Sequence, residues 1–155
     1  MQNRKDIFES ACLKEFAYLS EFRFQLIKRE KSNYGCFLRY QNSFVALDIS
    51  LVGSGIVIVF FKLQNDAIPE YPVFFDPEAE FLVFHAIDLI AVKTGKIFEQ
   101  ISARLFEQDY LETKVKEFAS LLRMHATDIF QGDFTVLENV KQRVVHRWAE
   151  LKNES

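Results

Sequence analysis

Cysteine, proline and glycine are scarce in this chain, which has two, three and five of them among 155 residues. Cys12 and Cys36 lie far apart and form neither a CxxC motif nor an even-numbered framework of half-cystines. This spacing excludes a disulfide-stapled fold and indicates free thiols in a reducing compartment. The few glycines and prolines also exclude a collagen-like or low-complexity chain, so the composition is typical of a globular protein.

Motifs for metals and cofactors are also missing. The three histidines form no HxxxH or HExxH pattern, whereas a zinc site normally draws on three or four convergent ligands. The Thr-Gly-Lys segment at 94–96 lacks the first glycine of a phosphate-binding loop, and the Gly-Ser-Gly segment at 53–55 lacks the third glycine of a dinucleotide fingerprint. We therefore predict no metal and no cofactor, and we interpret both segments as turns.

Long apolar runs are absent as well. The charge-free stretch at residues 49–61 is thirteen residues long and is interrupted by the turn at 53–55, whereas a membrane helix needs about 20 apolar residues. The first residues are polar and charged where a secretory signal would need an apolar segment. We expect no membrane association and a cytoplasmic location.

Positive charge is unevenly distributed in a chain whose net charge is −3. Residues 63–92 contain no lysine or arginine, yet they contain six carboxylates: Asp66, Glu70, Asp76, Glu78, Glu80 and Asp88. Helix capping can account for the group at 76–80, but it does not account for Asp66, for Glu70 or for the missing cations. A solvated acidic face is one interpretation, and a surface that steers a basic partner is the other.

A basic stretch at residues 23–39 balances the acidic one. It lies among Phe22, Phe24, Tyr34, Phe37 and Tyr40, a combination that could indicate an aromatic platform for single-stranded nucleic acid. Alternation instead places most of these rings on an interior face and the cations in water. We therefore predict no nucleic-acid partner.

Phenylalanine is abundant, with seventeen copies, and the spacing of apolar residues defines the first half of the fold. Phe8, Cys12, Phe16 and Leu19 share one side of a helix expected at residues 4–20. A period of two follows from Phe22, and strands are then predicted at 36–40, 44–51 and 56–61. Because the connections are short, we expect an antiparallel meander.

The second half of the chain is predicted to be mainly helical. Residues 64–77 form the longest irregular stretch, in which 71–75 could add an edge strand. Asp76, Pro77 and Glu78 resemble a helix start, so a buried helix is expected at 78–94, stopped by Gly95. Further helices are predicted at 97–107, from 111 to just before Gly132, and from Asp133 onward, the last two packed on each other.

These patterns predict a single α+β domain over residues 1–155. Its N-terminal helix is followed by an antiparallel sheet of three to five strands and then by about four C-terminal helices packed on the sheet. His85 and His125 each precede an aspartate by three residues, at Asp88 and Asp128, which could raise imidazole basicity for catalysis. We interpret both instead as histidines at the edge of the core, and we assign no catalytic residue.

The order of elements resembles small bacterial proteins of the polymorphic-toxin immunity type. The residues that carry the resemblance lie at 16–24, at Tyr34-Gly35 and at 129–134. The resemblance implies a stoichiometric inhibitor that binds a toxin domain and performs no chemistry. It transfers no functional residue to this chain.

The leading functional hypothesis is a non-catalytic protein-binding module with a basic protein partner. Its predicted contact residues are Asp66, Glu70, Tyr71, Phe74, Phe75, Asp76, Glu78 and Glu80. One alternative is a small-molecule binder or enzyme with an apolar pocket between the sheet and the helix at 78–94. Another is an acidic homodimer similar to secretion chaperones, so both a monomer and a homodimer remain open.

Overall fold

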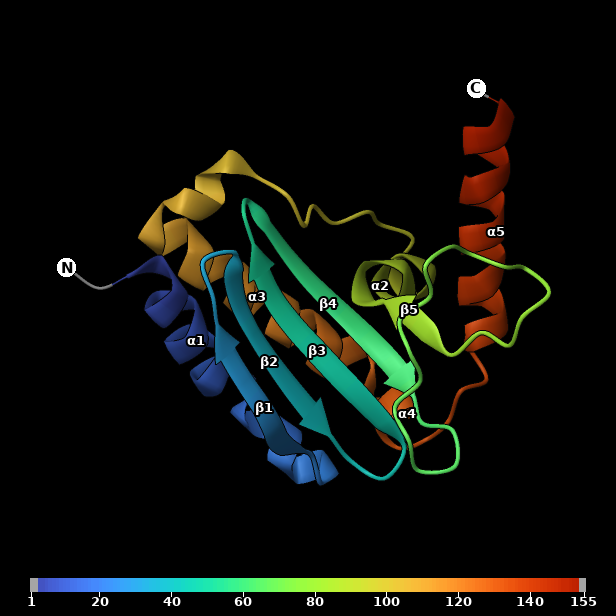
Figure 1. Cartoon of the computed structure of the whole chain (residues 1–155), viewed down its shortest axis with the longest axis horizontal. Coiled ribbons are helices and arrows are strands. Elements are labelled where there is room, and N and C mark those ends of the chain that lie inside the picture. The colour runs from blue at the N-terminus through green and yellow to red at the C-terminus, as the bar shows by residue number, and fades with distance from the viewer. Residues whose placement is uncertain (1–2, 154–155) are drawn as a thin grey trace.

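The computed structural model describes residues 3–153 and has the α+β architecture that the sequence predicts (Figure 1). The first elements are α1 (Arg4–Glu15), a 3₁₀ turn η1 (Ala17–Phe22), β1 (Gln25–Lys31), β2 (Gly35–Gln41), β3 (Val45–Val52) and β4 (Gly55–Lys62). The remaining elements are β5 (Val83–His85), α2 (Ala86–Thr94), a 3₁₀ turn η2 (Ala103–Phe106), α3 (Gln108–His125), α4 (Thr127–Phe130) and α5 (Leu137–Asn153). The five strands pair antiparallel in chain order, which confirms the meander.

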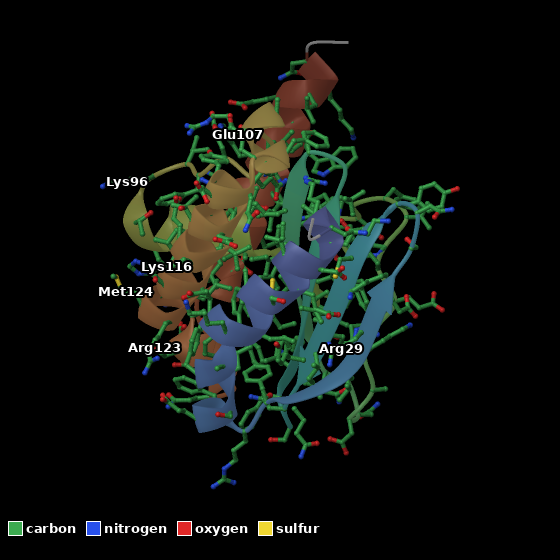
Figure 2. The ribbon with its side chains drawn as sticks, turned by 90° about the vertical axis from the view of Figure 1, so that its left-hand side faces the viewer. Arg29, Lys96, Glu107, Lys116, Arg123 and Met124 are labelled. Carbon is green, nitrogen blue, oxygen red and sulfur yellow. The ribbon has the colours of Figure 1, made fainter. Side chains whose placement is uncertain are left out.

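The helices gather on one side of the sheet. Figure 1 shows α1 and α3 behind the strands, and the turned view of Figure 2 shows sheet and helices as two layers. Alternate residues of the central strands, among them Leu38, Leu47 and Phe60, join Phe8 and Phe118 in one buried cluster. The period-two pattern therefore placed alternate apolar side chains on this face, as expected. The intervening residues Ala46, Val59 and Phe61 form a second, smaller buried cluster.

Two details of the N-terminal half differ from prediction. The helix predicted to reach residue 20 ends at Glu15, and the tighter η1 carries the chain to Arg23, which adopts a left-handed conformation with φ of 65°. This turn still buries Phe16 and Leu19. The strand expected from Phe22 begins at Gln25, and most of β1 is exposed because β1 forms the edge of the sheet.

The hairpin between β2 and β3 is confirmed, and Asn42 holds its turn. The Asn42 Oδ1 atom accepts hydrogen bonds from the backbone N–H groups of Phe44 (2.9 Å) and Val45 (3.0 Å). Its Nδ2 donates to the carbonyl oxygens of Phe22 (3.1 Å) and Phe130 (2.8 Å). One buried amide thus ties the sheet to η1 and α4.

The helix predicted at 78–94 is partly wrong. Asp76 Oδ1 does accept a hydrogen bond from the Glu78 N–H at 2.9 Å, but this contact closes only a turn. The chain continues to residue 82, forms β5, and enters α2 at Ala86. Pairing with β4 explains the change, because Phe84 lies opposite Phe60 and their rings stack 5.2 Å apart. The edge strand predicted at 71–75 does not form, and α2 ends at Gly95 (φ 73°) as predicted.

The helix predicted at 97–107 is also wrong. The segment is irregular up to η2, apart from an isolated bridge between Ile101 and Gly55, and Ile97 is 81% exposed. Backbone hydrogen bonds hold it against the β3–β4 turn, from Ile56 N to Gln100 O (2.8 Å) and from Ser102 N to Ser54 O (2.9 Å). A long-range backbone contact therefore overrides the local apolar spacing.

The end of the chain departs from prediction in its packing. The single helix expected up to Gly132 breaks at Ala126 into α3 and α4. Gly132 adopts a left-handed conformation, with φ of 84°, and the helix expected from Asp133 onward begins at Leu137 instead. However, α5 packs mainly against α2 and not against α3, at the opposite side of the molecule from α1 (Figure 1). No helix among residues 3–153 is long and apolar enough to cross a membrane.

Candidate functional site

The connection between β4 and β5, residues 63–82, is the longest irregular segment between two strands, and all eight predicted contact residues lie on it. We call it the acidic loop. Its base is closed by a backbone hydrogen bond from Lys62 N to Leu82 O at 2.8 Å, and another runs from Leu63 N to Phe44 O at 3.0 Å. Loops longer than about 12–15 residues are uncommon inside compact domains and are usually functional when ordered.

Apolar side chains project from the tip of the acidic loop. Val73 is 99% exposed, Phe74 is 71% exposed and Tyr71 is 55% exposed. Phe75 differs, because its ring stacks on Trp148 of α5 at 6.1 Å and meets the edge of Phe81 at 6.5 Å. Two of the three predicted anchors are therefore free to touch a partner, and the third fastens the loop to α5. Sequence reasoning missed Val73, which has no spacing signal inside an irregular segment.

The carboxylates of the acidic loop are exposed and carry no ion pair among the described residues: Asp66, Glu70, Asp76, Glu78 and Glu80. Glu80 accepts a hydrogen bond from Gln64 Nε2 at 3.2 Å, and Asp76 accepts the turn hydrogen bond from Glu78. Neither contact neutralises charge. The run of six carboxylates seen in the sequence thus divides into five on the surface and Asp88, which is buried.

Five of the eight predicted residues line one hollow of about 140 Å³ inside the acidic loop, which we call the loop hollow. They are Glu70, Phe74, Phe75, Asp76 and Glu80. The remaining walls include Pro69, Pro72 and Phe81. Asp66 and Glu78 lie on the loop outside this hollow, and Tyr71 lines a neighbouring one.

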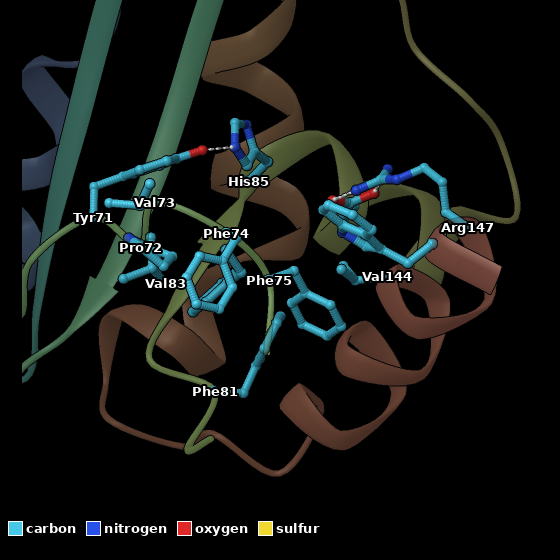
Figure 3. Close-up of a pocket in the computed structure, with 13 residues that line it drawn as sticks. Tyr71, Pro72, Val73, Phe74, Phe75, Phe81, Val83, His85, Val144 and Arg147 are labelled. Atoms are coloured by element: carbon cyan, nitrogen blue, oxygen red, sulfur yellow. Dashed lines mark hydrogen bonds and ion pairs between the residues drawn. The ribbon is translucent and has the colours of Figure 1, made fainter. Parts of the chain in front are cut away.

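The neighbouring hollow, of about 210 Å³, lies between residues 71–75, β5, α2 and α5, and we call it the helix hollow. Figure 3 shows Tyr71 and His85 on one side of it and Arg147 on the other, with Phe75 and Phe81 along its lower edge. It lies near the predicted pocket, but α2 contributes only Asp88 to its lining, whereas α5 contributes Val144, Arg147 and Trp148.

His85 joins the acidic loop to β5. Its Nε2 lies 2.8 Å from the Tyr71 hydroxyl, with which it shares a hydrogen bond, and the two rings meet edge to face. Burial lowers the pKa of His85, and the nearby Asp88 carboxylate opposes that effect only in part. The folded protein therefore favours a neutral imidazole at this position.

Asp88 does not pair with His85 as the sequence suggested it could. It is only 1% exposed, and its carboxylate accepts hydrogen bonds from Arg147 Nη1 (2.8 Å) and Nη2 (3.1 Å) and from Arg143 Nε (3.2 Å). Asp128 likewise binds Lys93 Nζ at 2.7 Å. Both aspartates thus hold helices together, and neither is a free partner for a catalytic imidazole.

The stability of the protein should depend on pH through His85. In the unfolded chain its pKa returns to about 6.5, so as the pH falls below that value the unfolded state takes up a proton that the folded state resists. This contribution is therefore fully present above pH 6.5 and is lost as the pH falls toward the lowered folded-state pKa. Urea unfolding between pH 8 and pH 5 should show a shallower loss of stability in His85→Gln than in the wild type.

His146→Gln is the control, because His146 is exposed and lines neither the loop hollow nor the helix hollow. It should keep the wild-type slope. An unchanged slope in His85→Gln would show that this imidazole does not contribute to the pH dependence.

The described residues contain no group of three or more histidine, cysteine, aspartate or glutamate side chains that could hold a metal ion. The acidic loop is thus a set of surface carboxylates around an aromatic hollow. No protein-family model, no curated protein and no solved structure matches this chain significantly.

Proposed function

We propose that this chain is a non-catalytic protein-binding module whose contact surface is the acidic loop and whose partner presents a basic surface. The observation that carries the proposal is the exposed apolar tip at Val73 and Phe74, flanked by five carboxylates that pair with no cation among the described residues. Binding hot spots commonly combine apolar anchors with surrounding charge.

Physical chemistry favours this use of the loop. Burying a side chain of the size of valine or phenylalanine stabilises a complex by about 1.5–3 kcal/mol, and the loop leaves both in water. The carboxylates would attract a basic partner from a distance, which raises the association rate more than the final affinity. The closed loop base and the Phe75–Trp148 stack reduce the ordering cost of binding.

Inhibition of a bacterial toxin is the specific form of this proposal that the resemblance to immunity proteins suggests. A toxin that acts on nucleic acid or on membranes commonly uses a basic surface, and an acidic loop could cover such a surface without performing chemistry. The helices and the sheet would then act as the scaffold that holds the loop in position.

A small ligand in the helix hollow is a second candidate function, favoured by the presence of His85 and Asp88 in its lining. The hollow is smaller than the roughly 300–1,000 Å³ of typical ligand sites. Its polar groups are also engaged, since Tyr71 binds His85 and Arg147 binds Asp88. Binding of a small fragment fits this geometry better than catalysis does.

The homodimer alternative is disfavoured at this surface. Two acidic loops facing each other would bring five carboxylates against five, and like charges in contact cost free energy. A homodimer would therefore need a different face of the molecule.

A photo-crosslinking amino acid at Phe74, with a second version at Met124, tests the proposal. Met124 is exposed and points away from the body on the α3 side (Figure 2). We expect position 74, and not position 124, to capture one basic protein from the native lysate. The identified partner is then purified, and its affinity for the uncrosslinked chain is measured at several salt concentrations.

Neutralising the acidic loop should weaken that affinity by about tenfold or more and reduce its salt dependence. The variant changes all five carboxylates, as Asp66→Asn, Glu70→Gln, Asp76→Asn, Glu78→Gln and Glu80→Gln. A control variant neutralises five exposed carboxylates elsewhere: Glu99, Glu107, Asp109, Glu112 and Glu138. Equal losses in the two variants, or equal capture at both crosslinker positions, would contradict the proposal.

A further inference from the structure

The loop hollow has walls of two kinds. Phe74, Phe75 and Phe81 supply aromatic surface, and Glu70, Asp76 and Glu80 supply carboxylates. No lysine or arginine lines the hollow, and the three carboxylates form no ion pair with any described residue. The hollow is therefore apolar within and negatively charged.

A lysine or arginine side chain matches both properties at once. Its apolar stem can lie along aromatic rings, and its charged end is attracted both to the ring faces and to carboxylates. An apolar side chain would instead desolvate the carboxylates without giving them a partner, and an anionic group would be repelled. The chemistry thus favours a cation carried on a carbon chain.

The size of the loop hollow agrees with this occupant. Its volume of about 140 Å³ is several times the roughly 30 Å³ that one water molecule occupies in the liquid. It is well below the roughly 300–1,000 Å³ of sites for drug-sized ligands. One side chain fits these limits better than a whole metabolite does.

The inner wall is held in place before any partner binds. A row of ring contacts runs outward from the core, from Phe60 to Phe84 (5.2 Å), then to Phe81 (6.1 Å) and Phe75 (6.5 Å). Phe75 also stacks on Trp148, while Phe74 at the outer side remains mostly exposed. A wall that is already ordered lowers the entropic cost of binding.

We infer that the loop hollow is a socket for one lysine or arginine side chain of the partner protein. This inference rests on the proposed function and adds the identity of the group that the acidic loop recognises. Glu70, Asp76 and Glu80 hold the cation, and Phe74, Phe75 and Phe81 hold its apolar stem.

The test is a nuclear magnetic resonance titration of the full chain, labelled with ¹⁵N, against n-butylguanidinium chloride. Two matched probes separate the contributions: n-butanol has the stem without the charge, and guanidinium chloride has the charge without the stem. All titrations are made at one ionic strength. Saturable shifts of backbone amides within residues 69–83 are expected with n-butylguanidinium and not with the other two probes.

Glu70→Gln with Glu80→Gln should weaken n-butylguanidinium binding by about tenfold, because two charge-assisted contacts are lost. Glu99→Gln with Glu112→Gln, which removes the same charge elsewhere, should leave it unchanged. The absence of saturable shifts, equal binding of n-butanol, or equal affinity in the two double variants would overturn the inference.

The socket and the proposed function can fail separately. If position 74 captures a partner but n-butylguanidinium does not bind, the socket is wrong and the binding module stands. If n-butylguanidinium binds as expected but the neutralised acidic loop keeps full affinity for the captured partner, the socket is a cation site and the proposed function fails.

Discussion

Phe130→Ala is expected to lower the free energy of unfolding by about 3–5 kcal/mol. The Phe130 side chain is buried at the meeting point of several rings, with centroids 5.1 Å from Phe22, 5.3 Å from Phe24 and 6.2 Å from Phe60. Truncation removes apolar surface from the core and leaves a cavity that strands and helices together cannot close. Urea unfolding followed by circular dichroism measures the loss.

Phe74→Ala is the matched control for this prediction. Phe74 is exposed at the tip of the acidic loop, so its truncation should change stability by no more than about 0.5 kcal/mol. It should nevertheless weaken partner binding, since an exposed anchor acts in the complex and not in the fold. A loss for Phe130→Ala as small as that for Phe74→Ala would show that the ring cluster is not a main source of stability.

Replacing Arg143 and Arg147 together by methionine is expected to cost about 3–5 kcal/mol. The two arginines provide the three hydrogen bonds that reach the Asp88 carboxylate, which is buried at the α2–α5 contact. Without them the carboxylate stays buried without a cation, or it must take up a proton. Urea unfolding at pH 7, followed by circular dichroism, gives the size of this loss of stability.

Adding Asp88→Leu to the double variant tests whether the buried, unpaired carboxylate causes the loss of stability. Replacing a whole buried ion pair by apolar side chains is often close to neutral, so the triple variant should recover much of the lost stability. Lys28→Met serves as the exposed control, because its ion pair with Glu30 lies in solvent and should contribute less than about 1 kcal/mol. A triple variant no more stable than the double variant would contradict a role based on the buried charge.

The Asp88 contacts should also affect the loop hollow, because α5 supports the acidic loop. Asp88 fixes α5 to α2, and Trp148 of α5 stacks on Phe75 of the loop. Loss of the two arginines should therefore loosen the inner wall of the loop hollow as well as destabilise the fold. The n-butylguanidinium titration, repeated below the unfolding range, provides a readout of that change.

Much of the site was visible in the sequence, because its composition is local. The missing lysine and arginine, the clustered carboxylates and the aromatic residues at 71–75 are all properties of one contiguous segment. Their grouping around one hollow was not visible. It depends on Phe81, on β5 and on Trp148, which approach the loop only through strand pairing and helix packing.

The errors of the sequence prediction share one physical origin. The capping residues at 76–78 and the apolar spacing at 97–105 both favour helix over a few residues. In the folded chain, β5 instead pairs with β4, and residues 100–102 bind the β3–β4 turn. In both segments, contacts with distant parts of the chain satisfy the backbone N–H and C=O groups. These contacts outweigh the modest local preference for helix.

The sequence by itself determined the buried side of α1, the antiparallel meander of β1 to β4 and the end of α2 at Gly95. It could do so because the spacing of apolar residues, the turn-forming residues and the left-handed glycines all reflect interactions between residues close together in the chain. Tertiary structure alone decided that β5 would extend the sheet, that Asp88 would bind two arginines of α5, and that three carboxylates would meet three rings. The first two features join residues far apart in the chain. The third lies within one segment, but β5 and Trp148 of α5 approach that segment only once the core has formed.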